Sequence, residues 1–545
     1  MTTSSFDYDV AIVGYGPTGV SAANFLGAYG IRCVVMERDR EIYPRARAVT
    51  VNDWTLRCYQ SVGLADELLK VMDPMTEMRW RTYAGKDLMR MKVPDPEMGL
   101  PVASMIYQPA MEQVLRAGVE RFASRVEVRF GQEVTLLRSV GAGSEVSFRD
   151  VDTGVQRCLT ARYVLACDGG SSNVRTQLGI PLEGSTTDTK WVVIDVRVKR
   201  WWPERHLLTF WSDAKRPVVD IPLALGNHRW EFPLAEHESE KDFSTHDQLW
   251  TLLATMGVTP ENIEIHQHAF YKHHVRRAQR WRSGSVFLLG DAAHLMPPWA
   301  GSGMQSGIRD AFNLCWKIRE VLGGRLPESI LDSYEAERAP NVAFVTAESE
   351  RLGRIIKRQM TAAEKFDAVH RLIRKALHMR DLPQPLAGLP ALDAGWMSAV
   401  PTKTNLVGKM PPQPRVADVR GRQGRLDDFL GMGFVLVGDG VDPAELLSGS
   451  QQAAWAALNS RYIALREGSQ GATSENELID LDGSFLDWMR ARNTKCVALR
   501  PDRFVVAADD ALNVPVLPPA SMEARYPARS SVSMPAAVSS SPDRA

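Results

Sequence analysis

The sequence predicts an α/β protein whose Rossmann-like first part is interrupted by a mostly antiparallel sheet and followed by a further α/β unit. Three observations predict this arrangement. Residues 8–37 read as strand, glycine-rich turn, helix and second strand. Residues from about 185 to 280 form short aromatic and β-branched runs, which favour antiparallel strands. Between about 415 and 515, buried-type apolar runs return at 434–437, 462–465 and 496–499.

The glycine-rich turn has the Gly-x-Gly-x-x-Gly spacing of dinucleotide-binding proteins. Gly14, Gly16 and Gly19 follow the apolar run at 10–13 and precede a helix predicted from about 20 to 29. The glycines allow a tight turn, close approach of a pyrophosphate and close packing of helix on strand. The next apolar run ends at Glu37, whose carboxylate can accept hydrogen bonds from a ribose. The sequence therefore predicts a dinucleotide site, against the alternative of a plain glycine-rich turn.

Two later stretches share the strand-to-loop form. The run at 163–167 leads into Asp168 and Gly169, and the run at 286–289 leads into Gly290, Asp291 and a long helix from about 306 to 322. Neither repeats the full glycine spacing. We therefore expect one nucleotide to be held tightly and any second one to bind transiently or differently.

The composition excludes several classes of protein. The 545 residues contain 65 Lys+Arg and 65 Asp+Glu, so no net field favours nucleic acid or an anionic membrane. The six cysteines form no Cys-x-x-Cys pair, and the polar N-terminus lacks a basic secretory n-region, which favours a reducing, cytoplasmic setting. No apolar run is long enough to span a bilayer.

Three motifs in this order resemble one known family. They are residues 14–19 with Glu37, Cys-Asp-Gly-Gly-Ser-Ser-Asn-Val-Arg at 167–175, and Gly-Asp-Ala-Ala-His at 290–294. The ordered triple resembles the class A FAD-dependent aromatic hydroxylases (flavoprotein monooxygenases), especially 3-(3-hydroxyphenyl)propionate hydroxylase-like enzymes and their phenol- and polyketide-hydroxylating relatives. The similarity runs nearly end to end. It includes Arg-Pro-Asp-Arg-Phe-Val at 500–505, typical of a thioredoxin-like C-terminal domain in these enzymes.

The resemblance implies a Rossmann-like FAD-binding domain with an inserted antiparallel-sheet substrate domain and a C-terminal thioredoxin-like domain. The expected boundaries are 1–184 and 281–400 for the two parts of the FAD-binding domain, the second with a helical segment, 185–280 for the substrate-binding sheet, 410–520 for the thioredoxin-like domain and 521–545 for a disordered tail. That third domain lacks a Cys-x-x-Cys motif, so we expect a packing or oligomer role for it, not a redox role.

The resemblance also implies where FAD binds. The adenylate half would be held by the first motif, which contributes Gly14, Gly16, Pro17, Thr18, Gly19, Glu37 and Arg38. Arg47 would lie near the pyrophosphate and flavin, and Gln108, at the start of a helix, would approach the ribityl chain.

The two later motifs would return to the same cofactor. In the family, the pair Asp168 and Gly169 is associated with FAD and with the nicotinamide cofactor, and Gly290 with Asp291 binds the ribityl hydroxyls. The loop at 297–305 would wrap the isoalloxazine ring with backbone donors, through Pro298, Gly301, Gly303, Met304 and Gln305. Many relatives read Gly-Gln-Gly-Met-Asn where this chain has Gly-Ser-Gly-Met-Gln at 301–305, so the substrate-facing side is expected to differ.

The implied reaction is hydroxylation of a small phenolic substrate in aromatic catabolism. NAD(P)H would reduce tightly, non-covalently bound FAD, dioxygen would react with it, and a flavin 4a-hydroperoxide would attack the ring. Trp299, Tyr271, Trp211 and Trp191 are candidates for the substrate wall, with plain packing as the alternative. The sequence contains no local signature for a catalytic base, and a homodimer is an open alternative to a monomer.

Other interpretations stay open at this level. His266 and His268 share a strand face that a metal could use, but no acidic or cysteine cluster is near them, and we expect no metal. His294 fits a structural role better than that of a general acid. The Arg-rich stretch at 276–282 suits either an anion or solvent. A flavoprotein oxidase or dehydrogenase, a hydroxylase of a polyketide-type aromatic and a flavin-binding protein without turnover are the alternative functions.

Overall fold

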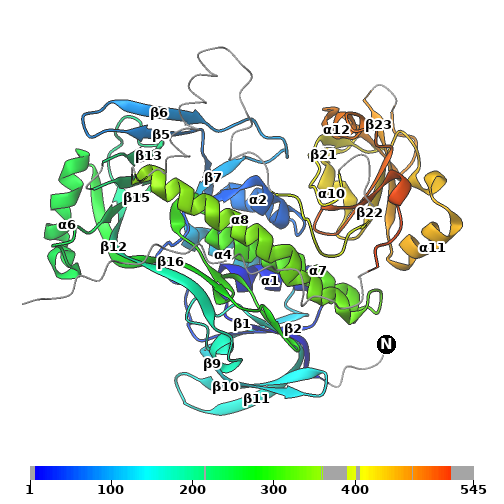
Figure 1. Cartoon of the computed structure of the whole chain (residues 1–545), viewed down its shortest axis with the longest axis horizontal. Coiled ribbons are helices and arrows are strands. Elements are labelled where there is room, and N and C mark those ends of the chain that lie inside the picture. Colours follow the sequence, from blue (N-terminus) through cyan, green and yellow to red (C-terminus); the bar gives the residue numbers. More distant parts are fainter. Residues whose placement is uncertain are drawn as a thin grey trace, which may run out of the picture.

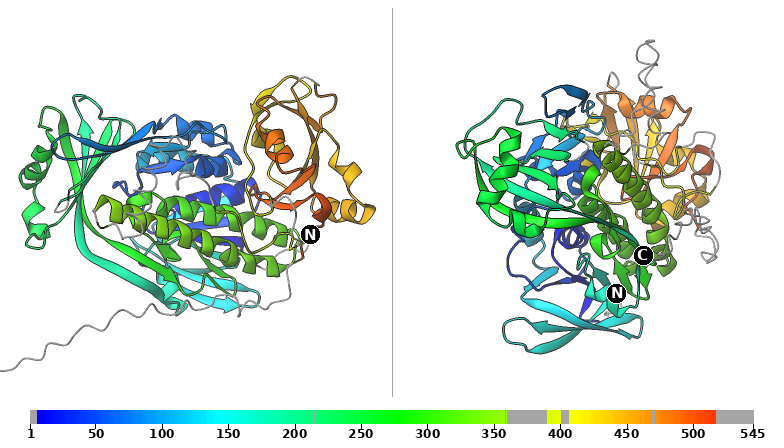
Figure 2. Two further views of the ribbon diagram at one scale, coloured as in Figure 1. Left: turned by 45° about the horizontal axis from the view of Figure 1, so that its top comes forward. Right: turned by 60° about the vertical axis from the view of Figure 1, so that its left-hand side comes forward.

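The computed structural model describes residues 6–213, 216–357, 359, 390–399, 406–468 and 471–516. The predicted α/β class is confirmed, because helices pack against three sheets of seven or eight strands. The second sheet lies at one end of the molecule and the C-terminal unit at the other (Figures 1 and 2). The predicted tail at 521–545 lies outside the described residues, as does most of the link around 360–405.

The first sheet is mostly parallel and brings the three motifs together. Its strand order is β17-β18-β11-β1-β2-β8, with the meander of β9 and β10 attached to β11. Their bounds are β1 (Tyr8–Val13), β2 (Cys33–Glu37), β8 (Val126–Phe130), β9 (Gln132–Val140), β10 (Gly143–Asp150), β11 (Gln156–Ala166), β17 (Arg282–Ser283) and β18 (Val286–Leu288). Because β18, β11 and β1 are parallel neighbours, the loops that follow them leave the sheet at the same edge, where such sheets bind ligands.

Two helices pack on this sheet at the edge where the three motif loops leave it, which we call the motif edge. Helix α1 (Pro17–Ala28) begins earlier than predicted, because Pro17 suits a first helical position. Helix α7 (Gly303–Leu322) lies against α1 and beside α8 (Ser333–Ile356), and Figure 2 shows the two long helices running side by side. The shorter helices and strands of this part are α2 (Asp53–Gln60), α3 (Ala65–Leu69), α4 (Gln108–Glu120), α5 (Asn173–Gln177), β3 (Thr50–Asn52), β4 (Met72–Pro74) and β7 (Ala103–Ile106).

The second sheet confirms the predicted antiparallel region and extends beyond it. Its order is β19-β16-β12-β15-β14-β13-β5-β6. The bounds are β5 (Glu77–Arg81), β6 (Asp87–Lys92), β12 (Leu182–Val198), β13 (Leu208–Trp211), β14 (Val218–Pro222), β15 (Asn227–Pro233), β16 (Ile263–Ala278) and β19 (His294–Leu295). The pair β13–β5 is parallel. One face packs on α6 (His246–Leu253), and the other faces the first sheet's motif edge.

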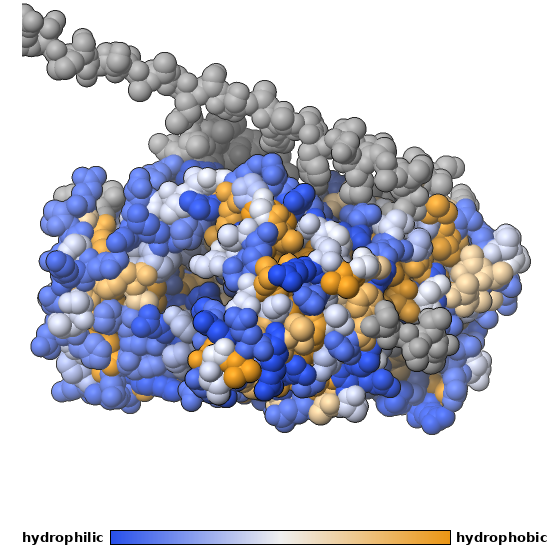
Figure 3. Space-filling view, turned by 90° about the horizontal axis from the view of Figure 1, so that it is seen from below, coloured by the Kyte–Doolittle hydropathy of each residue, from blue (hydrophilic) through white to orange (hydrophobic). Residues whose placement is uncertain are grey.

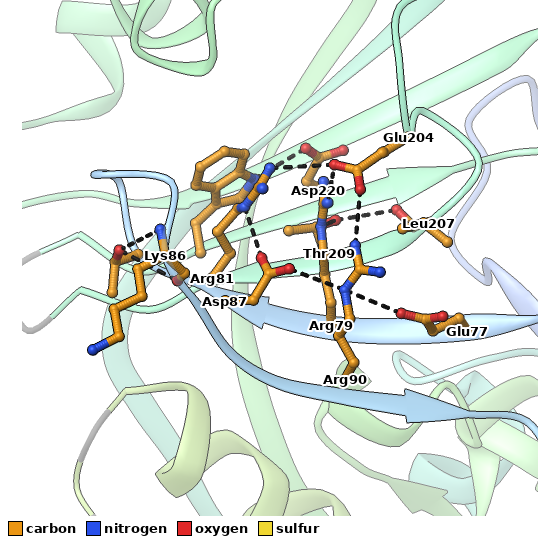
Figure 4. Close-up of polar contacts among 12 residues, drawn as sticks. Glu77, Arg79, Arg81, Lys86, Asp87, Arg90, Glu204, Leu207, Thr209 and Asp220 are labelled. Atoms are coloured by element: carbon orange, nitrogen blue, oxygen red, sulfur yellow. Dashed lines mark hydrogen bonds and ion pairs between the residues drawn. The ribbon is translucent and has the colours of Figure 1, made fainter.

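A cluster of charges holds β5 and β6 to the rest of the second sheet (Figure 4). Glu204, in the left-handed region at φ 63°, accepts hydrogen bonds from the guanidinium groups of Arg79, Arg81 and Arg90. Arg79 also donates to Thr209 on β13 at 3.0 Å. Because the Arg79 side chain is almost fully buried, its charge depends on Glu204 for compensation. The hairpin is thereby fixed to the sheet edge.

The C-terminal unit contains the third sheet, in the order β21-β20-β24-β23-β22-β25-β26. The bounds are β20 (Arg415–Ala417), β21 (Gln423–Arg425), β22 (Val435–Asp439), β23 (Arg461–Glu467), β24 (Glu477–Asp480), β25 (Cys496–Leu499), β26 (Val505–Ala508), α10 (Leu426–Leu430), α11 (Gly449–Ala457) and α12 (Ser484–Arg490). Strands β24, β23 and β22 are parallel, and β25 and β26 run antiparallel to their neighbours. A mixed α/β unit was expected here, and its thioredoxin-like character stays a prediction.

The helices and one face of the molecule can be examined for long apolar stretches. In the described part of the chain, every helix is too short or too polar to cross a bilayer. The face shown in Figure 3 carries hydrophobic residues in several separate areas among hydrophilic ones.

Candidate active site

The turn after β1 is built so that one glycine is left open. Gly14 has φ +95°, and a Cβ on Gly19 would lie 2.0 Å from the carbonyl oxygen of Gly14, so both positions require glycine. A Cβ on Gly16 would meet nothing within 4 Å. The open side of Gly16 is therefore the side from which a ligand can approach the backbone.

The same turn offers hydrogen-bond donors to an anion. The N–H groups of Gly16, Thr18 and Gly19 have no hydrogen-bond partner among the residues that the structure describes. The Tyr15 N–H donates to Glu37 Oε2 at 2.7 Å, which fixes that carboxylate beside the turn. Free N–H groups at a helix N-terminus with an acid on the next strand fit the pyrophosphate and ribose of a dinucleotide. Arg38 is exposed and pairs only loosely with Asp39, at 3.7 Å.

The polar groups of the loop after β11 mainly form hydrogen bonds within that loop. Asp168 accepts hydrogen bonds from Ser172 Oγ at 2.6 Å and from the Val174 N–H at 3.1 Å, at the start of α5. Burial raises the pKa of Asp168, although these hydrogen bonds oppose the rise. Gly169 is left-handed at φ +80°. Arg175 donates to the carbonyl oxygens of Gly170 and Ala292, and so joins this loop to the next one.

The loop after β18 packs directly on the first turn. A Cβ on Gly290 would lie 2.5 Å from Thr18 Oγ1, and one on Gly307 would lie 2.3 Å from the same atom. Asp310 accepts hydrogen bonds from the Gly290 N–H at 3.0 Å and shares one with His294 Nε2 at 2.7 Å. His294 therefore orients the loop, in line with its structural interpretation.

Arg47, Gln108 and Asp291 meet although they are far apart in the sequence. Gln108 Oε1 accepts hydrogen bonds from the N–H groups of Arg47 and Ala48, at 2.8 and 2.7 Å. The guanidinium of Arg47 lies 3.8 Å from the Asp291 carboxylate, and both side chains are well exposed. The amide oxygen of Gln108 thus positions the loop that carries Arg47. The polar ends of Arg47 and Asp291 stay exposed at the sheet edge where the motif loops meet.

The loop before α7 presents a second set of free donors. Helix α7 begins at Gly303, and its first N–H groups, at Gly303, Met304 and Gln305, have no partner in the described part of the chain. The side chain of Gln305 accepts from the Asn52 N–H at 2.9 Å and from Thr55 Oγ1 at 2.8 Å. Its amide therefore ties α7 to α2, and the backbone is what remains to stabilise negative charge on a ligand.

Three of the four predicted wall residues come together, and with His273 they form what we call the aromatic box. Trp191 and Trp299 have ring centroids 4.9 Å apart and nearly perpendicular planes, and Tyr271 lies opposite Trp191 in the pairing of β12 with β16. Trp299 belongs to the short 3-10 turn Pro298–Ala300 in the loop before α7. Trp211 points to the other face of the second sheet, where its Nε1 donates to Asp220 at 3.0 Å.

A buried set of charges lies on the same sheet face as the aromatic box. Arg229 forms a two-point ion pair with Asp195, at 2.7 and 3.0 Å, and also donates to the backbone carbonyls of Ala46 and Arg47. The Tyr271 hydroxyl donates to Glu231 at 2.8 Å. Burial raises the pKa of Tyr271 well above 10, and the charge of Glu231 adds to the rise.

Sequence reasoning predicted Tyr271 but missed the charged side chains of Arg229, Asp195 and Glu231. Charged residues at alternating positions of β15 were the available signal, because Arg229 and Glu231 must share one face of the strand. That signal alone does not show which face is buried. The histidines His266 and His268 lie on β16 as expected, and the described residues contain no group of three or more potential metal ligands.

Comparisons with known proteins show which family the chain belongs to. The family described as FAD binding domain matches residues 7–349, more than half of the chain, and the HcaD C-terminal domain family matches residues 408–520. A Burkholderia vietnamiensis protein named 3-(3-hydroxy-phenyl)propionate/3-hydroxycinnamic acid hydroxylase 2 is 33% identical over 93% of this chain and 94% of its own. A Burkholderia cenocepacia protein named 3-(3-hydroxy-phenyl)propionate/3-hydroxycinnamic acid hydroxylase is 34% identical over 92% and 94%.

Solved structures show the same fold. The structure of aklavinone-11 hydroxylase with FAD and aklavinone matches with a TM-score of 0.75 at 24% identity, over 93% of this chain and 96% of that one. The donors at the two helix starts fit an anionic flavin dinucleotide, and the ordered motifs, the matched FAD-binding family and the long relatives agree with them. The chain belongs to the class A FAD-dependent aromatic hydroxylases, and FAD is its cofactor.

Proposed function

We propose that the protein uses NAD(P)H and dioxygen to hydroxylate a phenol of the 3-hydroxyphenylpropionate type, in cytoplasmic catabolism of aromatic compounds. The aromatic box carries this proposal. Trp191 and Tyr271 of the second sheet meet Trp299 of the loop before α7, and we assign the planar substrate ring to a position against these aromatic side chains, beside the flavin site. Support for the substrate class comes from the relatives named for 3-hydroxyphenylpropionate and 3-hydroxycinnamate, at 33–34% identity over more than nine-tenths of the chain.

The cofactor contacts form part of the proposal. We assign the adenylate end of FAD to the turn at 14–19 with Glu37, and the pyrophosphate and ribityl region to Arg47 and Asp291. The flavin ring is assigned to the backbone donors at 303–305. Support comes from the free N–H groups at both helix starts and from the exposed Arg47–Asp291 pair.

Each part of the site has a task in the reaction. Bound FAD, once reduced, supplies the electrons that activate dioxygen. The N–H groups at 303–305 and the positive end of α7 stabilise negative charge at the site. The aromatic box positions the substrate ring and excludes water from it. Arg229 fixes the Arg47 loop by its hydrogen bonds to the carbonyls of Ala46 and Arg47.

A single set of measurements tests the proposal. The purified protein should show a bound-flavin visible spectrum and should consume NADH or NADPH faster when 3-hydroxyphenylpropionate or 3-hydroxycinnamate is present. A dihydroxylated product should appear with less than one peroxide per NAD(P)H. Peroxide equal to all NAD(P)H consumed, with every phenol, would instead identify an oxidase, and turnover of polycyclic aromatics alone would identify a polyketide-type hydroxylase.

A further inference from the structure

One buried histidine lacks the hydrogen bond that its counterparts have. His228, His273 and His294 are buried in the described part of the chain, with at most 2% of each exposed. His228 Nε2 pairs with Asp220 at 2.6 Å, and His294 Nε2 pairs with Asp310 at 2.7 Å. Neither ring nitrogen of His273 has a partner among the described residues, and its Nε2 is fully enclosed. An unpaired buried polar group opposes folding, and a bound ligand that pairs with it can recover that cost.

The surroundings of His273 are aromatic on three sides. Its ring stacks on Trp191 with centroids 5.4 Å apart and planes at 30°. Trp299 meets it edge-on at 4.8 Å, and Tyr271 lies at 5.1 Å. Because Trp299 belongs to the loop before α7, the imidazole is placed between the second sheet and the flavin-side loop. Flat aromatic walls around one polar atom are what a planar ring with one polar substituent requires.

The other strongly polar groups of this face are already bonded. The Tyr271 hydroxyl donates to Glu231, and Arg229 is held by Asp195. Trp191 Nε1 is buried without a partner, but several indole nitrogens of the described chain share that condition. A buried imidazole without any partner is the more informative feature, since the two other buried histidines are paired with aspartates.

The charge state of His273 limits what it can recognise. Burial, with smaller contributions from the positive charge of Lys357 and from His274, lowers its pKa to about 3. The ammonium of Lys357 lies over the Trp299 ring, 5.6 Å from its centroid. At neutral pH the imidazole is therefore uncharged, with one donor and one acceptor nitrogen. Such a ring can pair with a neutral hydroxyl, which can both give and accept a hydrogen bond.

We propose that His273 is a specificity-determining residue that hydrogen-bonds the ring hydroxyl of a phenol held against Trp191 and Trp299. This inference rests on the proposed function and adds the contact by which the site distinguishes a phenol from the same molecule without its hydroxyl. Without the hydroxyl, His273 stays buried and unpaired, and that cost opposes binding of the wrong ring.

The test measures binding and not turnover. The oxidised holoenzyme is titrated with 3-hydroxyphenylpropionate and with 3-phenylpropionate, which lacks only the hydroxyl, and the flavin absorbance change gives each Kd. The wild-type protein is expected to prefer the phenol by roughly tenfold to a hundredfold. His273→Phe keeps a flat ring without hydrogen-bonding atoms, and it should reduce the preference to about threefold or less, whereas His273→Gln should keep part of it.

A neighbouring histidine supplies the matched control. His274 is next in the chain, and its Nδ1 shares a hydrogen bond with Thr186 Oγ1 at 2.9 Å outside the aromatic box. His274→Phe should leave the preference for the phenol unchanged. If His273→Phe keeps the full wild-type preference, the inference is wrong while the proposed function stands. If the wild-type protein binds and hydroxylates no phenol, the proposed function itself fails.

A measurement on the wild-type protein covers the case in which His273→Phe does not load flavin. The ¹⁵N resonances of the His273 ring should shift when 3-hydroxyphenylpropionate is added and should stay in place with 3-phenylpropionate. Equal shifts with both ligands would overturn the inference.

Discussion

Arg57 donates from Nε and Nη2 to the two carboxylate oxygens of Asp427, at 2.6 and 3.0 Å, across 370 positions of the chain. Both side chains are almost fully buried. Arg57 lies in α2, whose N-cap Asn52 donates its backbone N–H to Gln305 in the first turn of α7. One ion pair thus connects the C-terminal unit with the helix next to the proposed flavin ring site.

We predict that Asp427→Asn destabilises the whole protein. The variant leaves the buried Arg57 without its countercharge, which costs about 3–5 kcal/mol. Urea unfolding should show the loss, and the temperature of flavin release should fall with it. Asp66→Asn is the control, because Asp66 pairs with Arg425 of the same C-terminal unit but is well exposed. Such surface pairs contribute about 1 kcal/mol or less. Equal effects of the two variants would contradict the prediction.

The effect of Asp427→Asn should depend on pH. Burial alone would raise the pKa of Asp427, but Arg57 and Arg503 outweigh it and hold the pKa below its ordinary value of 3.8. A carboxyl with a depressed pKa stabilises the fold above its unfolded-state pKa and loses that contribution as the pH falls through its folded-state pKa. The difference in unfolding free energy between wild type and variant should therefore be constant from pH 7 to 5 and shrink below about pH 4. A difference that grows on acidification would show the opposite shift.

Two glycine substitutions should separate cofactor binding from folding. Gly16 has an ordinary φ of −71°, and an added Cβ meets no protein atom, so Gly16→Ala should leave the stability of the apoprotein within about 0.5 kcal/mol. Its methyl group occupies the side left open for the pyrophosphate, and the Kd for FAD should rise by roughly tenfold to a hundredfold. Gly19→Ala should destabilise the apoprotein by about 3 kcal/mol or more, because its Cβ would lie 2.0 Å from the Gly14 carbonyl oxygen. Equal apoprotein stabilities of the two variants would count against this account of the turn.

We predict that Gly353→Ala displaces Trp299 of the aromatic box and weakens substrate binding. A Cβ at this position of α8 would lie 2.6 Å from Trp299 Nε1, so the indole, which also contacts His273, must move. We expect the KM for the phenol to rise about tenfold, as for an overpacking cost of about 1–3 kcal/mol. Gly449→Ala, at the start of α11, meets nothing within 4 Å and should leave KM unchanged. An unchanged KM in Gly353→Ala would show that Trp299 can yield without affecting the substrate.

Local sequence patterns were sufficient to predict features that depend on only a few adjacent residues. The turn at 14–19 could be predicted because Gly14 needs a left-handed φ and Gly19 leaves no room for a Cβ, and both needs appear in the spacing of glycines. The strands at 434–437 and 462–465 were visible as apolar runs, and they form β22 and β23. The sequence also showed that Asp168 and Gly290 each follow an apolar run, and these runs form the parallel neighbours β11 and β18.

The arrangement of side chains in the site could not be predicted from such local patterns. Trp191, Tyr271 and Trp211 looked equivalent as aromatic strand residues, yet Trp211 lies on the opposite face from the other two. Which face of a strand is buried depends on pairing with distant strands, and a shift of one residue exchanges the faces. The second sheet also includes β5 and β6, from residues 77–92, which no pattern near residues 185–280 could indicate.

The sequence by itself determined the α/β class, the position of the dinucleotide turn and the order of the three motifs, because glycine conformation and strand periodicity are properties of a few adjacent residues. Only the tertiary structure decided that His273 is buried without a partner beside Trp299, and that Arg57 of α2 depends on Asp427 of the C-terminal unit. Those facts depend on desolvation and on contacts between segments that are brought together only when the chain folds.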